Sequence, residues 1–198
     1  MTAIYLASAS PRRSELLKQL NITHTVLDVP AAPGEDEPRY AGESPLEYVT
    51  RTAQDKAERA IAWVQSQTDA LNDSLPILTA DTTVALGDQV LGKPRDAEDA
   101  RQILRSLSGT THIVYTAVVL SHAGQRFQAI STSRVSFTEL GEKEIAEYID
   151  SREPFGKAGA YGIQGIAAKF ISNLDGSYSG VMGLPLFETA KILKQAGF

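Results

Sequence analysis

The sequence predicts an α/β protein built on a mixed β-sheet with flanking helices. Short apolar, strand-forming runs alternate with amphipathic segments that carry helix-capping residues, a pattern typical of α/β proteins. Turn signals at Gly87-Asp88 and Ala123-Gly124 separate pairs of strand-forming runs. Because hairpins join antiparallel strands, the sheet is expected to be mixed rather than purely parallel.

The predicted helices begin at recognisable signals. Ser10 precedes Pro11, which suits the first helical position, and an apolar leucine stripe follows. Ser44 and Glu47 have the spacing of a capping box, and Asp96 is an N-cap candidate. The expected helices cover about residues 11–20, 45–63, 96–109, 142–150 and 186–195.

The predicted strands are apolar or β-branched runs bounded by turn residues. They cover about residues 4–7, 23–29, 76–80, a hairpin over 83–91, 111–121 and 125–137. Residues 30–45 are rich in proline, glycine and acid and are expected to form a loop. Residues 156–165 contain too much glycine for a helix.

Composition limits the class of protein. The 198 residues suffice for one domain over 1–198, or for two small lobes that share a cleft, and the 42% hydrophobic and 22% charged contents are those of a globular protein. The net charge of −5 argues against nucleic-acid binding, and no apolar run is long enough to span a membrane. The chain has no cysteine, and its first residues lack the order of a secretory signal. We therefore expect a cytoplasmic protein.

An anion site is predicted where the first strand meets the first helix. Residues 8–13 read Ser-Ala-Ser-Pro-Arg-Arg, so free amides at a helix N-terminus lie beside two adjacent guanidinium groups. Ser8, Arg12 and Arg13 are the candidate phosphate ligands, because arginine presents forked donors to phosphate oxygens. The alternative interpretation is a helix cap followed by solvated arginines.

Asp81 is the candidate catalytic carboxylate. It comes directly after the apolar run over residues 77–80, and open α/β sheets place ligand groups at the carboxyl ends of their strands. Taken alone, the residue is more typical of a turn aspartate that caps the backbone of Thr82 or Thr83.

Three further positions are weaker candidates. Lys56 lies on the long helix and Lys93 in a loop stiffened by Pro94, and either lysine could simply be solvated. Gln164, in the glycine-rich segment, carries both an amide donor and a carbonyl acceptor, as reading a nucleotide base requires. That segment could also be an ordinary turn between strands. The sequence contains no Walker A motif, Rossmann fingerprint or G-x-S-x-G elbow, and its three histidines lack ligand spacing.

Taken together, these segments resemble the Maf family of nucleoside triphosphate pyrophosphatases. The resemblance rests on segments that occur in order over nearly the whole chain. They are LASASPRRSELL at 6–17, ADTTV at 80–84, LGKPRD at 91–96, LSGTTHIVYTAV at 107–118, KAGAYGIQG at 157–165 and GLPL at 183–186. The resemblance implies an elongated fold with two lobes around a central cleft, of the kind shared with ITP pyrophosphatases. It also suggests a homodimer.

The resemblance further implies roles for individual residues. Asp81 would accept the proton of the attacking water, and Asp81 with Glu37 would bind a divalent metal, Mg²⁺ or Mn²⁺. Glu35 and Asp36 compete with Glu37 for that role. The side chains expected to hold the triphosphate are Ser8, Arg12, Arg13, Lys56 and Lys93. The GAYGIQG segment resembles the branch that acts on dTTP and UTP, in which Arg12, Thr82 and Gln164 go with substrate choice.

Two other functions remain open at this point. One is the same chemistry on 7-methyl-GTP or on a damaged purine nucleotide such as ITP. The other is a non-catalytic nucleotide-binding regulator of cell division, which would keep the cations but would not need Asp81.

Overall fold

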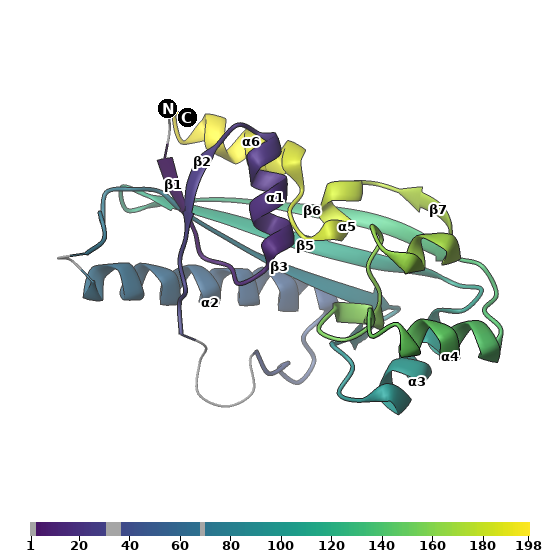
Figure 1. Ribbon diagram of the computed structural model, residues 1–198. Helices are drawn as coiled ribbons and strands as arrows, with labels where there is room; N and C mark the ends of the chain where they lie inside the picture. The colour runs from purple at the N-terminus through teal and green to yellow at the C-terminus, as the bar shows by residue number, and fades with distance from the viewer. Residues whose placement is uncertain (1–2, 31–36, 68–69) are drawn as a thin grey trace.

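The protein is built on a seven-stranded mixed sheet with strand order β2-β1-β3-β5-β6-β7, in which β4 pairs with β3 outside that path. The computed structural model describes residues 3–30, 37–67 and 70–198 (Figure 1). Strand β1 is parallel to β2 and β3, whereas β3 to β7 form antiparallel pairs. The expectation of a mixed sheet is therefore confirmed.

The regular elements follow in chain order. The strands are β1 Ala3–Leu6, β2 Thr23–Val26, β3 Ile77–Leu86, β4 Gln89–Leu91, β5 Thr111–His122, β6 Gln125–Phe137 and β7 Ile171–Asp175. The α-helices are α1 Pro11–Gln19, α2 Pro45–Ser66, α3 Ala97–Leu107, α4 Glu142–Asp150, α5 Tyr178–Met182 and α6 Leu186–Gln195. Two short 3₁₀ helices, Ala158–Ala160 and Ile166–Phe170, lie between α4 and β7.

Three details differ from the sequence prediction. Strand β3 does not end at Asp81 but continues to Leu86, because the residues that follow Asp81 are β-prone and pair with β5 throughout. The glycine-rich segment contains a short 3₁₀ turn, in which Gly159 has a φ of 68°. Strand β7 and helix α5 were missed, since both are five residues long and carry weak periodic signals.

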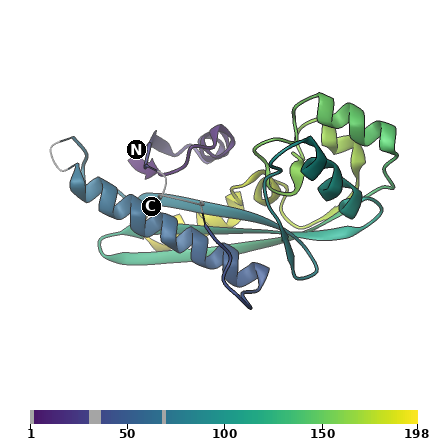
Figure 2. The ribbon, with the colours of Figure 1, turned by 90° about the horizontal axis from the view of Figure 1, so that it is seen from below.

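The long helix α2 crosses one face of the sheet (Figure 2). Its inward face carries Ala53, Ala57 and Ala60, all fully buried, and such small side chains let the helix axis approach the strands closely. The first two pack with Val49 against Ala117 and Val119 of β5, both fully buried. This contact fixes the height of α2 over β3 and β5, and with it the position of any side chain on the flank of the helix.

Two larger hydrophobic cores lie at opposite ends of the elongated molecule. Helices α1 and α6 cover the other face of the sheet at one end, where Leu16, Leu17 and Ile192 pack against β1, β3 and β5. Helices α3 and α4 gather at the other end around Leu104, Tyr148 and their neighbours (Figure 1). The strands β3, β5 and β6 run through both regions, so the two lobes share one sheet.

The edge of β3 is interrupted between the two lobes. On that side, β1 pairs with Ile77 and Leu78, and β4 pairs only from Val84 onward. Among the pairings of the described residues, Asp81–Thr83 have a partner strand only in β5. This gap leaves the middle of β3 open toward the space between the lobes.

No helix among the described residues is long and apolar enough to cross a membrane.

His112 is a buried, uncharged histidine in the core of the second lobe. Its Nε2 lies 2.8 Å from the Tyr161 hydroxyl, and its ring meets Phe137 and Tyr161 edge to face. Its Nδ1 has no hydrogen-bond partner among the described residues. Burial lowers the pKa of His112 to about 4.

Because the folded protein takes up this proton only near pH 4, whereas the unfolded chain takes it up near pH 6.5, stability falls as the pH drops between these values. The full contribution is roughly 3 kcal/mol at about 1.4 kcal/mol per pKa unit. We expect the free energy of unfolding of the wild type to fall more steeply from pH 6.5 to 4 than that of His112→Gln, as measured by denaturant titration. Parallel curves would contradict this reading of His112.

Candidate active site

A cavity of about 670 Å³ lies between the two lobes, at the gap along β3. Its walls come from the loop and first turn over Ala7–Arg13, from the flank of α2, from the middle of β3, and from two loops of the second lobe. It is lined by every predicted site residue, namely Ser8, Arg12, Arg13, Glu37, Lys56, Asp81, Thr82, Lys93 and Gln164. Glu35 and Asp36, the other candidate acids, lie outside the described residues.

Asp81 is held at the floor of the cavity as a buried carboxylate. Its side chain is 9% exposed, and its two oxygens accept hydrogen bonds from Lys56 Nζ at 2.6 Å and Thr52 Oγ1 at 2.7 Å. Burial alone would raise the pKa of Asp81, but the charge and hydrogen bond of Lys56, with Arg13 and Thr52, hold that pKa below its ordinary value. Asp81 is therefore ionised at neutral pH.

The interpretation of Asp81 as a backbone cap is wrong, and so is its placement at a strand end. Its hydrogen-bond partners come from α2, 25 and 29 residues away in the chain. Side chains alternate across a strand, so Asp81 faces α2 while Thr82 faces α1. Both side chains line the cavity because this stretch of β3 has no partner strand on the edge where β1 and β4 pair.

Glu37 is a second carboxylate on the same ammonium group. One of its oxygens lies 2.6 Å from Lys56 Nζ and 3.8 Å from an Arg59 nitrogen. Burial and the nearby Asp81 charge raise the pKa of Glu37 above its usual range, against the opposing pull of Lys56. Two carboxylates that share one lysine form an acidic pair that an added cation would stabilise.

The backbone around Glu37 is fixed from α2. Glu37 has a φ of 83°, a left-handed conformation that non-glycine residues adopt only where the surroundings enforce it. The Tyr48 hydroxyl donates to the Glu37 carbonyl at 3.0 Å, and the Arg51 guanidinium donates to the Pro38 carbonyl at 2.9 Å. Arg51 also forms an ion pair with Glu43 at 2.6 Å, which ties the end of this loop to the helix.

The spacing along α2 explains why several polar side chains meet at this wall. Tyr48, Thr52 and Lys56 follow one another at intervals of four residues, and Arg59 comes three residues later. Residues at these intervals share one face of a helix. This helical spacing would have supported the assignment of Lys56 to the site. Tyr48 and Arg59 were not predicted, although the same spacing places them on the same face of the helix.

The predicted anion site is formed by the loop that leaves β1. Ser10 occupies the N-cap position of α1, but its side chain makes no capping hydrogen bond. Pro11 has no N–H, and the Arg13 amide donates to the Ser10 carbonyl at 3.2 Å, so the Arg12 amide is the first-turn donor left for a ligand among the described contacts. Arg13 is engaged on three sides, by the Gly183 carbonyl at 2.8 Å, by Ser8 Oγ at 3.1 Å and by Thr82 Oγ1 at 3.4 Å. Its burial lowers its pKa, although Asp81 opposes that shift.

Arg12 and Lys93 differ from the other two cations. Within the described part of the chain, neither has an ion pair or hydrogen bond from its side chain, yet both line the cavity. Arg13 and Lys56 instead donate hydrogen bonds to groups of the protein. The cavity thus combines anchored cations with free ones, and the free ones are available to an anionic ligand without breaking existing contacts.

The second lobe contributes the glycine-rich segment. The amide of Gly165 donates to the Gly162 carbonyl at 3.0 Å, which closes a tight turn with Ile163 and Gln164 at its centre. Ile163 is 6% exposed and is part of the core, whereas Gln164 is exposed and lines the cavity. Lys157 lines the cavity as well and was not among the predicted site residues.

The donor set suits a hard divalent cation. Asp81 and Glu37 present carboxylate oxygens to one point, and such oxygens are the ligands that Mg²⁺ and Mn²⁺ prefer. The described residues contain no cluster of three or more acidic, histidine or cysteine side chains suited to a metal. A cation held by two carboxylates would need further oxygen ligands from water or from a bound molecule.

The fold and the cavity define an α/β protein with a cation-lined cavity between two lobes. The chain belongs to the Maf family, since the family model "Maf-like protein" matches residues 3–196. The chain is also 58% identical over 194 residues, covering 98% of it and 95% of the relative, to a protein of Bordetella avium named dTTP/UTP pyrophosphatase. A protein of the same name from Cupriavidus metallidurans is 55% identical, with 100% and 98% of the two chains covered.

Among solved structures, the Staphylococcus aureus Ham1 protein aligns with a TM-score of 0.42 at 12% identity, over 69% of this chain and 72% of that one.

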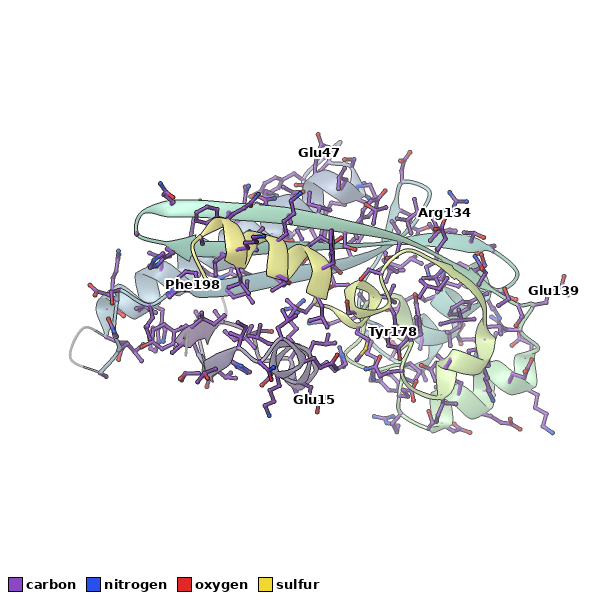
Figure 3. All side chains as sticks on the ribbon, turned by 90° about the horizontal axis from the view of Figure 1, so that it is seen from above. Glu15, Glu47, Arg134, Glu139, Tyr178 and Phe198 are labelled. Atoms are coloured by element: carbon purple, nitrogen blue, oxygen red, sulfur yellow. The ribbon has the colours of Figure 1, made fainter. Side chains whose placement is uncertain are left out.

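If Arg12 is a free cation of the anion site, its removal should weaken polyanion binding without destabilising the fold. We expect Arg12→Ala to lower the affinity for inorganic tripolyphosphate, measured by calorimetry at low salt, by about 10- to 100-fold, because one charge-assisted hydrogen bond is worth about 1.5–3 kcal/mol. The matched control is Arg134→Ala, an exposed arginine on β6 away from the cavity (Figure 3). Equal losses in both variants would mean that net charge, not Arg12, governs binding.

Proposed function

We propose that this chain hydrolyses dTTP and UTP to the nucleoside monophosphate and pyrophosphate, with water attacking the α-phosphorus. The observation that carries the proposal is the Asp81 carboxylate, held by Lys56 and Thr52 in a cavity that is also lined by cations and by the Gln164 amide. The names of relatives at 55–58% identity over nearly the full length support the same activity.

The proposed ligands match the charge of the substrate. A nucleoside triphosphate carries close to four negative charges, and the protein itself has a net charge of −5, so compensation must be local. Arg12 and Lys93 would bind phosphate oxygens directly, and Ser8 and the Arg12 backbone amide would add neutral donors. Arg13 keeps two of its five N–H groups free beyond its three contacts, enough to reach a phosphate oxygen as well.

Asp81 would act as the proton acceptor. Water oxygen forms a bond to the α-phosphorus, the bond from that phosphorus to the oxygen bridging to the β-phosphorus breaks, and the water proton passes to the Asp81 carboxylate. In the free protein Lys56 and Thr52 stabilise that carboxylate. Phosphate oxygens that draw Lys56 toward them would weaken this stabilisation and make Asp81 more basic when substrate is bound.

A divalent metal, Mg²⁺ or Mn²⁺, would be held by Asp81 and Glu37. When bound, it would neutralise phosphate charge and lower the pKa of water. Lys56 now bridges the two carboxylates at 2.6 Å from each, so it would have to yield part of that position to the metal. The lysine would then be free to bind the leaving pyrophosphate.

Base selection would lie on the second lobe and at the start of α1. Gln164 offers one donor and one acceptor to the edge of a pyrimidine, and Thr82 and Arg12 border the same space. Uracil and thymine share the same hydrogen-bonding edge, so a site of this kind would accept both. A site built around such a polar contact discriminates strongly against bases that leave it unpaired.

The direct test is to incubate the purified protein with dTTP, UTP, CTP, GTP, 7-methyl-GTP and ITP, with Mg²⁺ or with EDTA, and to identify the products by chromatography. The proposal expects dTMP and UMP with pyrophosphate, in the presence of metal only. Turnover confined to 7-methyl-GTP or ITP would keep the chemistry and replace the substrate. Tight binding of dTTP without any turnover would favour the non-catalytic regulator instead.

Asp81→Asn should remove the proton acceptor while keeping the shape of the side chain. We expect kcat on dTTP to fall by at least 10²–10⁴-fold, the usual contribution of a general base, with an unchanged circular dichroism spectrum. The control is Asp88→Asn, an exposed aspartate in the turn between β3 and β4 that should keep full activity. Near-native turnover by Asp81→Asn would rule out its assigned role.

A further inference from the structure

The turn that carries Gln164 is held from outside the cavity by a residue that does not line it. The turn spans Gly162 to Gly165 and is followed at once by the 3₁₀ helix Ile166–Phe170. A short helix of this kind starts with unpaired amides, which need acceptors. The acceptors are the carboxylate oxygens of Glu153, which follows α4 in the chain.

The Glu153 carboxylate fixes the end of the turn. It accepts from the amide of Ile166 at 2.8 Å and from the amide of Ala167 at 3.3 Å, and the Tyr148 hydroxyl donates to it at 2.9 Å. The carboxylate also lies directly against Gly165, where an added Cβ would come within 2.4 Å of both oxygens. Gly165 thus has no room for a side chain because Glu153 occupies that space.

Lys157, which binds the backbone of Glu153, packs against the start of the same turn. The Glu153 carbonyl accepts a hydrogen bond from the Lys157 ammonium, and the Lys157 methylenes lie over Gly162, 3.1–3.2 Å from where a Cβ would sit. Gly162 is in turn close to the Gln164 side chain, whose Oε1 would be 3.7 Å from that Cβ. Glu153 therefore binds the backbone after Gln164, and Lys157, which donates to the Glu153 carbonyl, packs against the start of the turn.

Tyr148, which donates a hydrogen bond to Glu153, is held in place by the core of the second lobe. Tyr148 is 1% exposed, and its ring meets Phe170 edge to face at 5.2 Å in the core of the second lobe. Burial, together with its hydrogen bond to Glu153, raises the pKa of Tyr148, so the phenol stays a donor. Among the described residues, the only cation that contacts Glu153 is Lys157, and it binds the backbone carbonyl. The Glu153 carboxylate therefore has the backbone amides and the Tyr148 hydroxyl as its hydrogen-bond donors.

We propose that Glu153 is a positioning residue for base selection, which sets the place of Gln164 by binding the backbone amides that directly follow its turn. This inference rests on the proposed function of the cavity, and it assigns a specificity role to a residue outside the cavity. A displacement of about 1 Å in a recognition group can cost a factor of about 10². The loss should fall on discrimination between bases rather than on the phosphates, whose ligands lie in the other lobe and on the β4–α3 loop.

The test is a double-mutant cycle read as a ratio of kcat/KM values, dTTP over CTP. We expect Glu153→Ala to lower this ratio at least about tenfold. Glu153→Gln should retain part of the preference for dTTP through its one remaining acceptor oxygen. Gln164→Ala should remove the preference, so that the ratio approaches one. In the Gln164→Ala background, Glu153→Ala should change the ratio little, because both changes act on the same contact. Amide hydrogen exchange at Ile166 and Ala167 should speed up in Glu153→Ala.

The matched control is Glu147→Ala, which removes a carboxylate from the exposed face of α4 and should leave the ratio unchanged. If the wild type prefers dTTP and Glu153→Ala keeps that preference, the positioning role is wrong while the proposed function stands. If the two changes multiply in the cycle, Glu153 does not act through Gln164. If the wild type hydrolyses neither dTTP nor UTP, the proposed function fails, and this inference fails with it.

Discussion

The Lys56 ammonium lies between two carboxylates, 2.6 Å from Asp81 and 2.6 Å from Glu37, and the rest of the cleft depends on that arrangement. Removing one partner of a buried ion pair leaves an uncompensated charge, so the three side chains must be placed together. The alanine-rich face of α2 sets the distance of Lys56 from β3, and Tyr48 and Arg51 hold the loop that brings Glu37 in. The packing of α2, the conformation of the loop that carries Glu37 and the ion pairs of Lys56 thus together place the three side chains.

The second constraint is the interrupted edge of β3. Because β1 stops beside Leu78 and β4 begins beside Val84, the middle of the strand meets a cavity rather than another strand. That break lets residues on opposite faces of β3 border one space, and it lets the second lobe place Gln164 opposite Arg12. In the proposed function, the base contact made by Gln164 lies on the second lobe and could change without disturbing Asp81, whereas Thr82 is the neighbour of Asp81 on β3.

Much of the fold could be predicted because capping and turn residues act locally. Ser44 with Glu47 and Asp96 do cap their helices, and the β5–β6 hairpin turns where expected. Strand β3 was predicted as two strands, because Asp81 was taken as the end of the first one, whereas the β-prone residues after it pair with β5 and continue the same strand. The site residues were predicted as one set from the resemblance to a family. The hydrogen-bond partners of Asp81, and those of Glu153 at Ile166 and Ala167, come from distant segments of the chain, so they could not be predicted from periodicity.

The central claim is that water attacks the α-phosphorus while Asp81 takes its proton, and the fate of the water oxygen tests it most directly. Hydrolysis of dTTP in water enriched in oxygen-18, followed by mass spectrometry of the products, locates the bond that breaks. The account predicts one labelled oxygen in dTMP and none in pyrophosphate. Label in pyrophosphate, or release of orthophosphate with dTDP, would place the attack on another phosphorus and contradict the assignment of the cleft.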